Sequence, residues 1–407
     1  MKNYFSLALL SLLFVLNLSC GKDENDVAIQ EYFSVESGKN QLENNMIDAL
    51  NKIDAFRNDN ALNEIIELAE FLNTSSGVKN SSFKNVALTS ISNVSSLKNA
   101  DFTIFNAKQS IALIEDTSLM EDYNNEKGTY LWDDSLKEFI KTGESDDIIY
   151  NVEYNNKVAV FSFTDFNTTT VTGSDINEEV PTLITANLKI NNTIVFSQNF
   201  NSTFQNNELV PSSINNTTTI GAFSFITTYS NLNNTKATQS FNFKIGKDII
   251  LGYSLESNGM FSNQNGGVEN GNIEDVIDNV TLNFNILDAN LLLTATDKDF
   301  DSDIKLSIDE AVARLNSNVK GKLSIKGQII AESQFYKDQD THTNFYWDYN
   351  AQQFYEEEIT EDIVNLRFLF SDGSTNDFET YFNGSFTEME TKFEAVFDAY
   401  IKHFENI

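Results

Sequence analysis

The acidic stretch DKDFDSDIKLSIDE, residues 297 to 310, is the densest group of potential ligand side chains in the sequence. Its carboxylates match the first, third, fifth and twelfth positions of a calcium-binding loop, whose ligands are hard oxygen atoms. These residues are Asp299, Asp301, Asp303 and Glu310. The sixth position is Ile304, where a β-branched side chain disfavours the sharp turn that such a loop makes with glycine. Calcium binding is one interpretation. The other is an acidic loop that caps a helix beginning near Ser307, with Asp309 and Glu310 in its first turn.

Other residue types used in catalysis are sparse. The two histidines, His342 and His403, have no second His or Cys at metal-ligand spacing and no recognisable Ser-His-Asp partners. Neighbouring carboxylates such as Asp133 and Asp134 could act as the acid pair of a glycosidase, but 60 acidic residues produce such pairs by chance. No phosphate-binding or nucleophile motif is present. We therefore expect no enzymatic activity, with a hydrolase as the alternative, and no cofactor other than the calcium considered above.

Two tryptophans, Trp132 and Trp347, begin similar stretches, WDDSLKEF and WDYNAQQFY. Each stretch is followed by an acidic turn and a segment with strand-like composition. Aromatic side chains at these positions could stack on sugar rings of a ligand. They could equally belong to the hydrophobic core, where aromatic residues on strands are common. The sequence leaves both interpretations open.

The chain has one cysteine, Cys20, which follows an apolar run from Leu7 to Leu18. Lys2 and this run have the order and length of a secretory leader, and the run is too short for a bilayer span of roughly 20 residues. We therefore expect residues 1–19 to be a signal peptide that is removed. For Cys20 itself, a small buried cysteine near an ordinary cleavage site is one interpretation.

The position of Cys20 directly after Ser19 resembles the lipobox of bacterial lipoproteins, although Asn17 stands where that family prefers leucine. The resemblance implies that the Cys20 sulfur is diacylated and that the leader is cut just before it. Two or more acyl chains, at ~0.8 kcal/mol per buried methylene, hold a protein lastingly in a membrane. The resemblance thus implies a membrane partner through an N-terminal lipid anchor.

Two short motifs suggest where the mature protein is displayed. The residues just after the cysteine resemble the lipoprotein export signal of Bacteroidota, which implies the outer face of the outer membrane. They are Lys22, Asp23 and Glu24. A solvated charged tether is the other interpretation of this segment. Asp134-Ser135-Leu136 resembles the O-glycosylation pattern of exported Bacteroidota proteins, which implies a glycan on Ser135.

Composition restricts the class of partner. The formal net charge is −33, and a surface this acidic repels both nucleic acid and anionic lipid head groups. Hydrophobic residues make up 41% of the chain and include 33 Phe, which favours a large core and excludes general disorder. Because Cys20 is the only cysteine, no internal disulfide can form, and the fold must be stabilised by burial.

Helical periodicity occurs near both ends of the chain. Apolar residues recur every three or four positions in residues 37–72, with a break at RNDN, residues 57–60. This pattern predicts two helices in an antiparallel pair, after a tether at 20–36 and within a helical and irregular region, 37–125. A second periodic stretch predicts a C-terminal helix over 386–404.

Residues 126–407 have mainly the pattern of β-hairpins. Outgoing strands alternate apolar and polar residues, the turns are polar or contain Gly, and return strands open with consecutive apolar residues. We predict an α+β fold, mainly antiparallel β, whose long hairpins form an extended or two-layer sheet or a half-barrel. An alternative division of this body is into two related halves, 126–230 and 231–407.

The acidic, Asn-rich body, with the hairpin GTYLWDDSLKEF followed by long amphipathic hairpins, resembles uncharacterised putative lipoproteins of Bacteroidota. The resemblance implies a location and a general architecture, but no activity. We expect an outer-membrane lipoprotein facing the cell exterior, acting as a non-enzymatic binding or adhesion module for a glycan or a protein. A carrier of an apolar, lipid-like ligand in a half-barrel cavity is the alternative.

Overall fold

The computed structural model describes residues 32–73, 83, 87, 118–172, 177–205, 211–232, 235–259, 277–296, 306–348, 353–377, 380–381, 386, 388–389 and 391–395. The named helices are α2 (Val35–Arg57), α3 (Asn60–Asn73), α6 (Leu119–Glu126) and α7 (Ile308–Asn318). The strands are β1 (Gly128–Asp133), β2 (Glu138–Gly143), β3 (Ile148–Tyr154), β4 (Lys157–Thr172), β5 (Asn177–Ile190), β6 (Thr193–Phe204), β7 (Pro211–Ile220), β8 (Phe223–Leu232), β9 (Lys236–Ile245), β10 (Asp248–Gly259), β11 (Ile277–Ile286), β12 (Ala289–Thr296), β13 (Val319–Ile325), β14 (Gln328–Asp348), β15 (Gln353–Leu369) and β16 (Thr375–Asp377).

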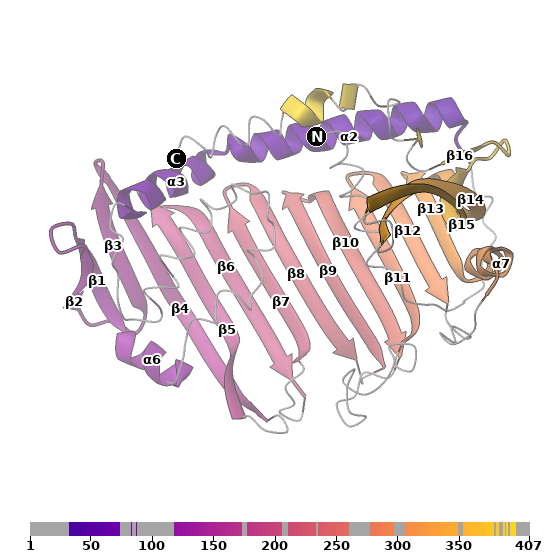
Figure 1. Cartoon of the computed structure of the whole chain (residues 1–407). Helices are drawn as coiled ribbons and strands as arrows, with labels where there is room; N and C mark the ends of the chain where they lie inside the picture. The colour runs from indigo at the N-terminus through magenta and orange to yellow at the C-terminus, as the bar shows by residue number, and fades with distance from the viewer. Residues whose placement is uncertain are drawn as a thin grey trace.

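These strands form one open sheet in the order β16-β15-β14-β13-β12-β11-β10-β9-β8-β7-β6-β5-β4-β3-β1-β2 (Figure 1). Neighbouring strands are antiparallel except β1 and β3, which are parallel. The predicted mainly antiparallel fold is confirmed, and of the arrangements left open the protein has the single extended sheet. The division at residues 230 and 231 falls inside β8, which pairs with β9 over its whole length, so both halves belong to one continuous sheet.

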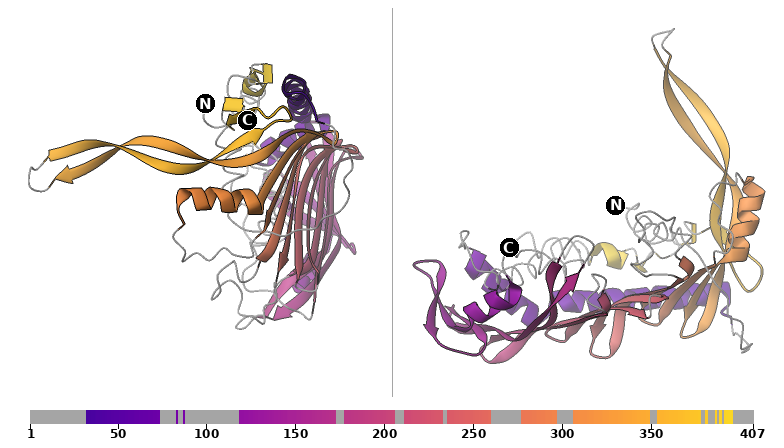
Figure 2. Two further views of the ribbon diagram at one scale, coloured as in Figure 1. Left: turned by 90° about the vertical axis from the view of Figure 1, so that its right-hand side faces the viewer. Right: turned by 90° about the horizontal axis from the view of Figure 1, so that it is seen from below.

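The two faces of the sheet differ in chemistry. Residues directly opposite one another on neighbouring strands share a face. One such row crosses β4 to β8 and is at most 6% exposed: Phe161, Leu188, Phe196, Ile220 and Phe223. We call this the apolar face. The described helices lie on this side of the sheet, whereas the opposite side, the polar face, carries none of them (Figure 2).

Helices α2 and α3 follow one another along the edge of the apolar face (Figure 1). The chain enters α2 beside β14, where Phe33 N donates to Ile329 O at 2.9 Å. Between the helices, Asp59 accepts a hydrogen bond from Ala61 N at 2.8 Å and starts α3. The two predicted helices and their break at RNDN are confirmed. The predicted antiparallel pairing is wrong, because each helix packs on a different part of the long sheet instead of on the other helix.

Tight two-residue turns join six hairpins, from β3–β4 to β13–β14, at the edge along which α2 and α3 run (Figure 1). The first residue of each turn has a positive φ, a conformation that favours Asn and Gly. The five turns that follow the β3–β4 turn each bond to the hairpin before them, as where Gly221 N donates to Val195 O at 3.1 Å. A Cβ on Gly221 would lie 2.3 Å from Asp59 Oδ1, so glycine lets the interhelical segment approach this turn.

Two of the six turns depart from Asn and Gly at the left-handed position: the β13–β14 turn has Lys326, with φ of 49°, and the β11–β12 turn has the branched, apolar Leu287, with φ of 48°. Such a conformation is costly for a bulky side chain. Asn45 of α2 contacts the backbone on both sides of Leu287: its Nδ2 donates to Ile286 O, and its Oδ1 accepts from Asp288 N at 3.1 Å. The helix therefore stabilises this turn with two hydrogen bonds that no residue of the hairpin supplies.

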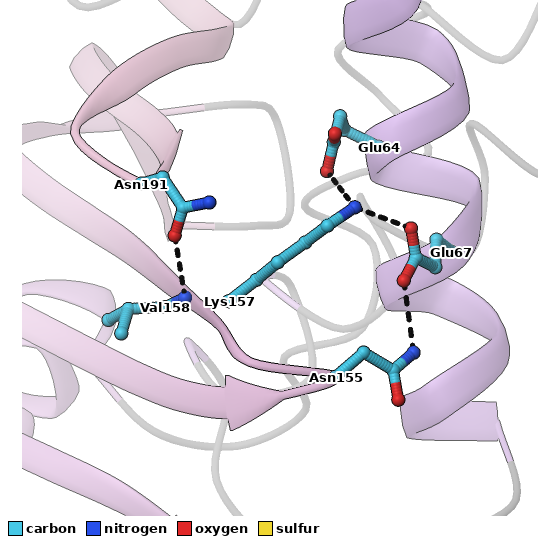
Figure 3. Close-up of polar contacts among 6 residues, drawn as sticks. All are labelled: Glu64, Glu67, Asn155, Lys157, Val158 and Asn191. Carbon is cyan, nitrogen blue, oxygen red and sulfur yellow. Dashed lines mark hydrogen bonds and ion pairs between the residues drawn. The ribbon is translucent and has the colours of Figure 1, made fainter.

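Lys157, the first residue of β4, joins α3 to the β3–β4 turn (Figure 3). Its Nζ lies 2.7 Å from Glu64 Oε2 and 2.6 Å from Glu67 Oε2, and Asn155 Nδ2 donates to Glu67 Oε1 at 2.9 Å. The hydrogen bond from Lys157 holds the pKa of Glu67 below its usual range. The carboxylate is therefore charged at neutral pH and binds α3 to the edge of the sheet.

A second core lies at the β14–β15 end of the sheet. Buried Phe386 and Met389 pack there with Tyr381, and Leu42 of α2 belongs to the same cluster. Residues 391–395 are helical, which confirms that part of the predicted C-terminal helix. Its continuation over 396–404 lies outside the described residues.

The Phe56 side chain at the end of α2 gives a direct test of this packing. It is 1% exposed and contacts Phe223, Phe225 and Phe243 edge to face, with centroids 5.0, 5.5 and 5.5 Å away. We expect Phe56→Ala to lower the free energy of unfolding by about 3–5 kcal/mol, measured by urea denaturation. The exposed Asn51→Ala on the same helix should change it by about 0.5 kcal/mol or less. Equal losses in both variants would contradict this role.

Candidate functional site

Strands β14 and β15 extend beyond the rest of the sheet as a two-stranded arm. β13 pairs with β14 only as far as Glu332, whereas β14 and β15 continue to pair to Asp348 and Gln353. Figure 2 shows the arm projecting away from the sheet on the side of the apolar face. We define the arm as residues 337–348 and 353–364. An isolated two-stranded ribbon is marginally stable in water, so its length requires an explanation.

The base of the arm is braced by α7. Asn316 of this helix makes two hydrogen bonds to the backbone of Phe335, its Nδ2 donating at 2.7 Å and its Oδ1 accepting at 2.8 Å. Across the ribbon, Arg367 stacks over the Tyr336 ring, 4.8 Å from its centroid, and donates to Gln334. These contacts fix the direction in which the arm leaves the sheet.

Aromatic side chains are exposed at the tip of the arm. Phe345 is 63% exposed, Trp347 40% and Tyr355 36%. In the pairing register, Phe345 is opposite Glu356 and Tyr355 is opposite Tyr346. Successive residues of a strand point to opposite faces, so the two faces of the ribbon both present aromatic surface. We call these three residues the aromatic tip.

The arm is strongly acidic. It contains eight Asp and Glu residues and one lysine, Lys337. That lysine is paired, with its Nζ 2.6 Å from Asp362 Oδ2, and this hydrogen bond holds the pKa of Asp362 below its usual range. His342 Nδ1 lies 3.6 Å from Asp340 and 3.9 Å from Glu361. The aromatic tip therefore stands in a negative field.

The structure separates the two tryptophans that the sequence made similar. In the strand register, Trp132 is opposite Phe139 and Trp347 is opposite Phe354. In both hairpins the opposite residue comes seven positions later in the sequence. The Trp132 ring meets the Phe139 ring edge to face at 5.1 Å and is only 6% exposed. This burial contradicts a sugar-stacking role for Trp132, which belongs to the core. Trp347 is on the surface, and a ligand role for it stays a prediction.

The described part of the proposed calcium loop has a structural role. Ser307 caps α7, and its Oγ lies 2.7 Å from Glu310 Oε2, while the Glu310 carboxylate also accepts from Ser307 N at 2.9 Å. This capping box confirms the helix-cap interpretation for Glu310. The other proposed ligands, Asp299, Asp301 and Asp303, lie outside the described residues. Within those described, no three His, Cys, Asp or Glu side chains are placed to hold a metal ion.

The remaining predicted site residues are placed as follows. Ser135 is exposed in the β1–β2 turn, where its Oγ and Asp133 Oδ1 are 2.5 Å apart, and its glycosylation stays a prediction. Cys20 lies outside the described residues, as do Lys22, Asp23 and Glu24. In the part of the chain that is described, no helix is both long and apolar enough to span a membrane.

An apolar cavity lies between α3 and strands β2 to β5. It is lined by Leu68, Leu72, Ala87, Phe139, Tyr150, Val152, Ala159, Phe161 and Leu188. Its volume is about 10 Å³, which is the space of roughly one water-sized sphere. An acyl chain does not fit in this cavity, so it gives the carrier hypothesis no support.

Comparison with known proteins finds no family model, curated protein or solved structure that matches this chain. A binding site is therefore inferred from the arm itself. Neither the exposure of the aromatic tip nor the length of β14 beyond β13 was evident from the sequence. The similarity between the stretches that begin at Trp132 and Trp347 was the one sequence signal that indicated residue 347.

The placement of the two tryptophans can be tested by fluorescence quenching. We expect acrylamide to quench Trp347 efficiently and Trp132 poorly, because they differ in exposure. With each ion compared with its quenching of free tryptophan, caesium should quench Trp347 better than iodide does, because the carboxylates of the arm attract cations. Trp347→Phe should remove the accessible component, whereas Trp132→Phe should retain it. The placement would be contradicted by a Trp347→Phe protein that is quenched as strongly as the wild type.

Proposed function

We propose that this protein is a lipid-anchored, outer-membrane binding module of the cell surface, and that it binds a protein ligand through the aromatic tip of its arm. The observation that carries the proposal is the exposure of Phe345, Trp347 and Tyr355 at the end of a braced, projecting ribbon. Exposed aromatic side chains of this kind bury much area on binding and dominate the energy of many interfaces.

The charge of the arm indicates the chemistry of the ligand. The exposed carboxylates of Glu356, Glu357 and Glu358 lie next to the aromatic tip. The formal net charge of the whole chain is −33. A partner with a cationic rim around an apolar pocket complements this surface and is attracted to it over a distance. Anionic ligands are repelled, so nucleic acid and anionic lipid are not proposed as partners.

The N-terminal sequence supports the proposed location. A lipid on Cys20 would hold the protein at the membrane. The predicted tether would separate the sheet from the lipid surface, but it would be shorter than 20–36, because Phe33 already bonds to β14 and α2 begins at Val35. Lys22, Asp23 and Glu24 support display on the outer face of the outer membrane. An arm that projects from such an anchored body would meet ligands in the surrounding medium.

The anchor is tested by Cys20→Ala. We expect this protein to be found in the soluble fraction after cell lysis, because no acyl chain can be attached to alanine. The measurement is the distribution between membrane and soluble fractions, with Ser19→Ala as the matched neighbour that should stay in the membrane fraction. Continued membrane association of Cys20→Ala would refute the anchor.

The arm is tested with a designed amphipathic peptide rich in Lys and Leu, and with a Glu and Leu peptide of the same length. We expect the cationic peptide to bind and the acidic one not to bind. Trp347→Ala should weaken binding about tenfold or more, measured by fluorescence anisotropy of a labelled peptide. Ile194→Ala, which removes another exposed apolar side chain, should have no effect. Equal binding of both peptides, or no loss in Trp347→Ala, would contradict the proposal.

A further inference from the structure

The polar face is almost free of charge over its central strands. It presents every second residue of β6 from Ser197 to Thr203, of β7 from Ser213 to Thr219, of β8 from Ser224 to Ser230, and of β9 from Thr238 to Lys244. Of these sixteen positions, fourteen are Ser, Thr or Asn, and the exceptions are Ile226 and Lys244. No acidic residue occurs among them, although the chain contains 60.

These polar side chains form a regular array. The register between β6 and β9 is unbroken over this region, as in the row Asn199, Thr217, Ile226 and Asn242. Hydroxyl groups on adjacent strands bond to one another, for example Thr228 Oγ1 and Ser240 Oγ at 2.6 Å. Rows of hydroxyl and amide groups therefore repeat across the strands every ~4.8 Å and along each strand every ~7 Å.

We infer that the polar face binds an extended, neutral polysaccharide. Hydroxyl and amide groups both donate and accept hydrogen bonds, as the hydroxyl groups of a sugar do. The distance between strands is close to the length of one sugar unit in an extended chain, so a chain lying across the strands would meet a new row with each unit. Because the array has no carboxylate and one charged residue, Lys244, it offers little electrostatic attraction to a charged ligand.

A second copy of this chain fits the polar face less well. Two copies, each with a formal net charge of −33, repel each other at long range. Serine is also depleted at protein–protein interfaces, which favour aromatic side chains, Met and Arg, and none of these occurs among the sixteen positions. The chemistry of this face therefore favours sugar over protein, and it is independent of the binding proposed for the arm.

Asn201 and Asn215 allow a test that does not disturb the core. They face each other across β6 and β7 and both are exposed. We expect electrophoresis of the full chain to be retarded in gels that contain at least one of three soluble neutral polysaccharides: mixed-linkage β-glucan, galactomannan or dextran. The double variant Asn201→Ala, Asn215→Ala should bind about tenfold more weakly, whereas Asn344→Ala, an exposed Asn of the arm, should bind as the wild type does.

Three outcomes would overturn the inference. The first is no retardation by any of the three polysaccharides, and the second is unchanged retardation of the double variant with an unchanged thermal unfolding midpoint. The third is a concentration-dependent dimer in sedimentation that the double variant abolishes, which would make this face a contact between copies. Trp347→Ala should leave the retardation unchanged, so failure of this inference and failure of the arm proposal give different results.

Discussion

The fold depends on covering one face of a very long sheet. A sheet whose hydrophobic residues all point to one side is unstable until another layer excludes water from that side. Helices α2 and α3 do this along the edge of the sheet, and Phe56 contacts phenylalanines of β8 and β9. Ion pairs between Lys157 and both Glu64 and Glu67 fasten the far end of the same layer. The helices thus connect strands that are distant in sequence.

This arrangement is possible because the tight turns lie at one edge. Short turns end the hairpins at one level, and hydrogen bonds from a turn to the hairpin before it keep successive hairpins aligned. A helix can then run past all of them, with Asn45 contacting the Leu287 turn and Asp59 approaching Gly221. The longer connections are at the opposite edge, where α7 precedes β13 and braces the arm.

The arm and the polar face are chemically opposite surfaces. The arm combines exposed aromatic rings with carboxylates, and the polar face combines hydroxyl and amide groups with almost no charge. The carboxylates of the arm also protect the protein, since unpaired edges of a ribbon are sites of aggregation and like charges discourage edge-to-edge pairing. Edge-to-edge pairing is also limited at one end of the sheet, because the edge strand β16 has only three residues.

The sequence by itself determined the hairpins, the two N-terminal helices and their break, because period-two and period-3.6 patterns and turn residues are local properties. It also determined the cap of α7, since Ser307 and Glu310 interact within one helical turn. Tertiary structure decided the single-sheet order, the end-to-end course of α2 and α3, and the different fates of Trp132 and Trp347. Those two residues begin similar hairpins, but only the first has Tyr150 and the α3 side of the core nearby. Burial depends on which elements meet in space, and a local sequence pattern does not contain that information.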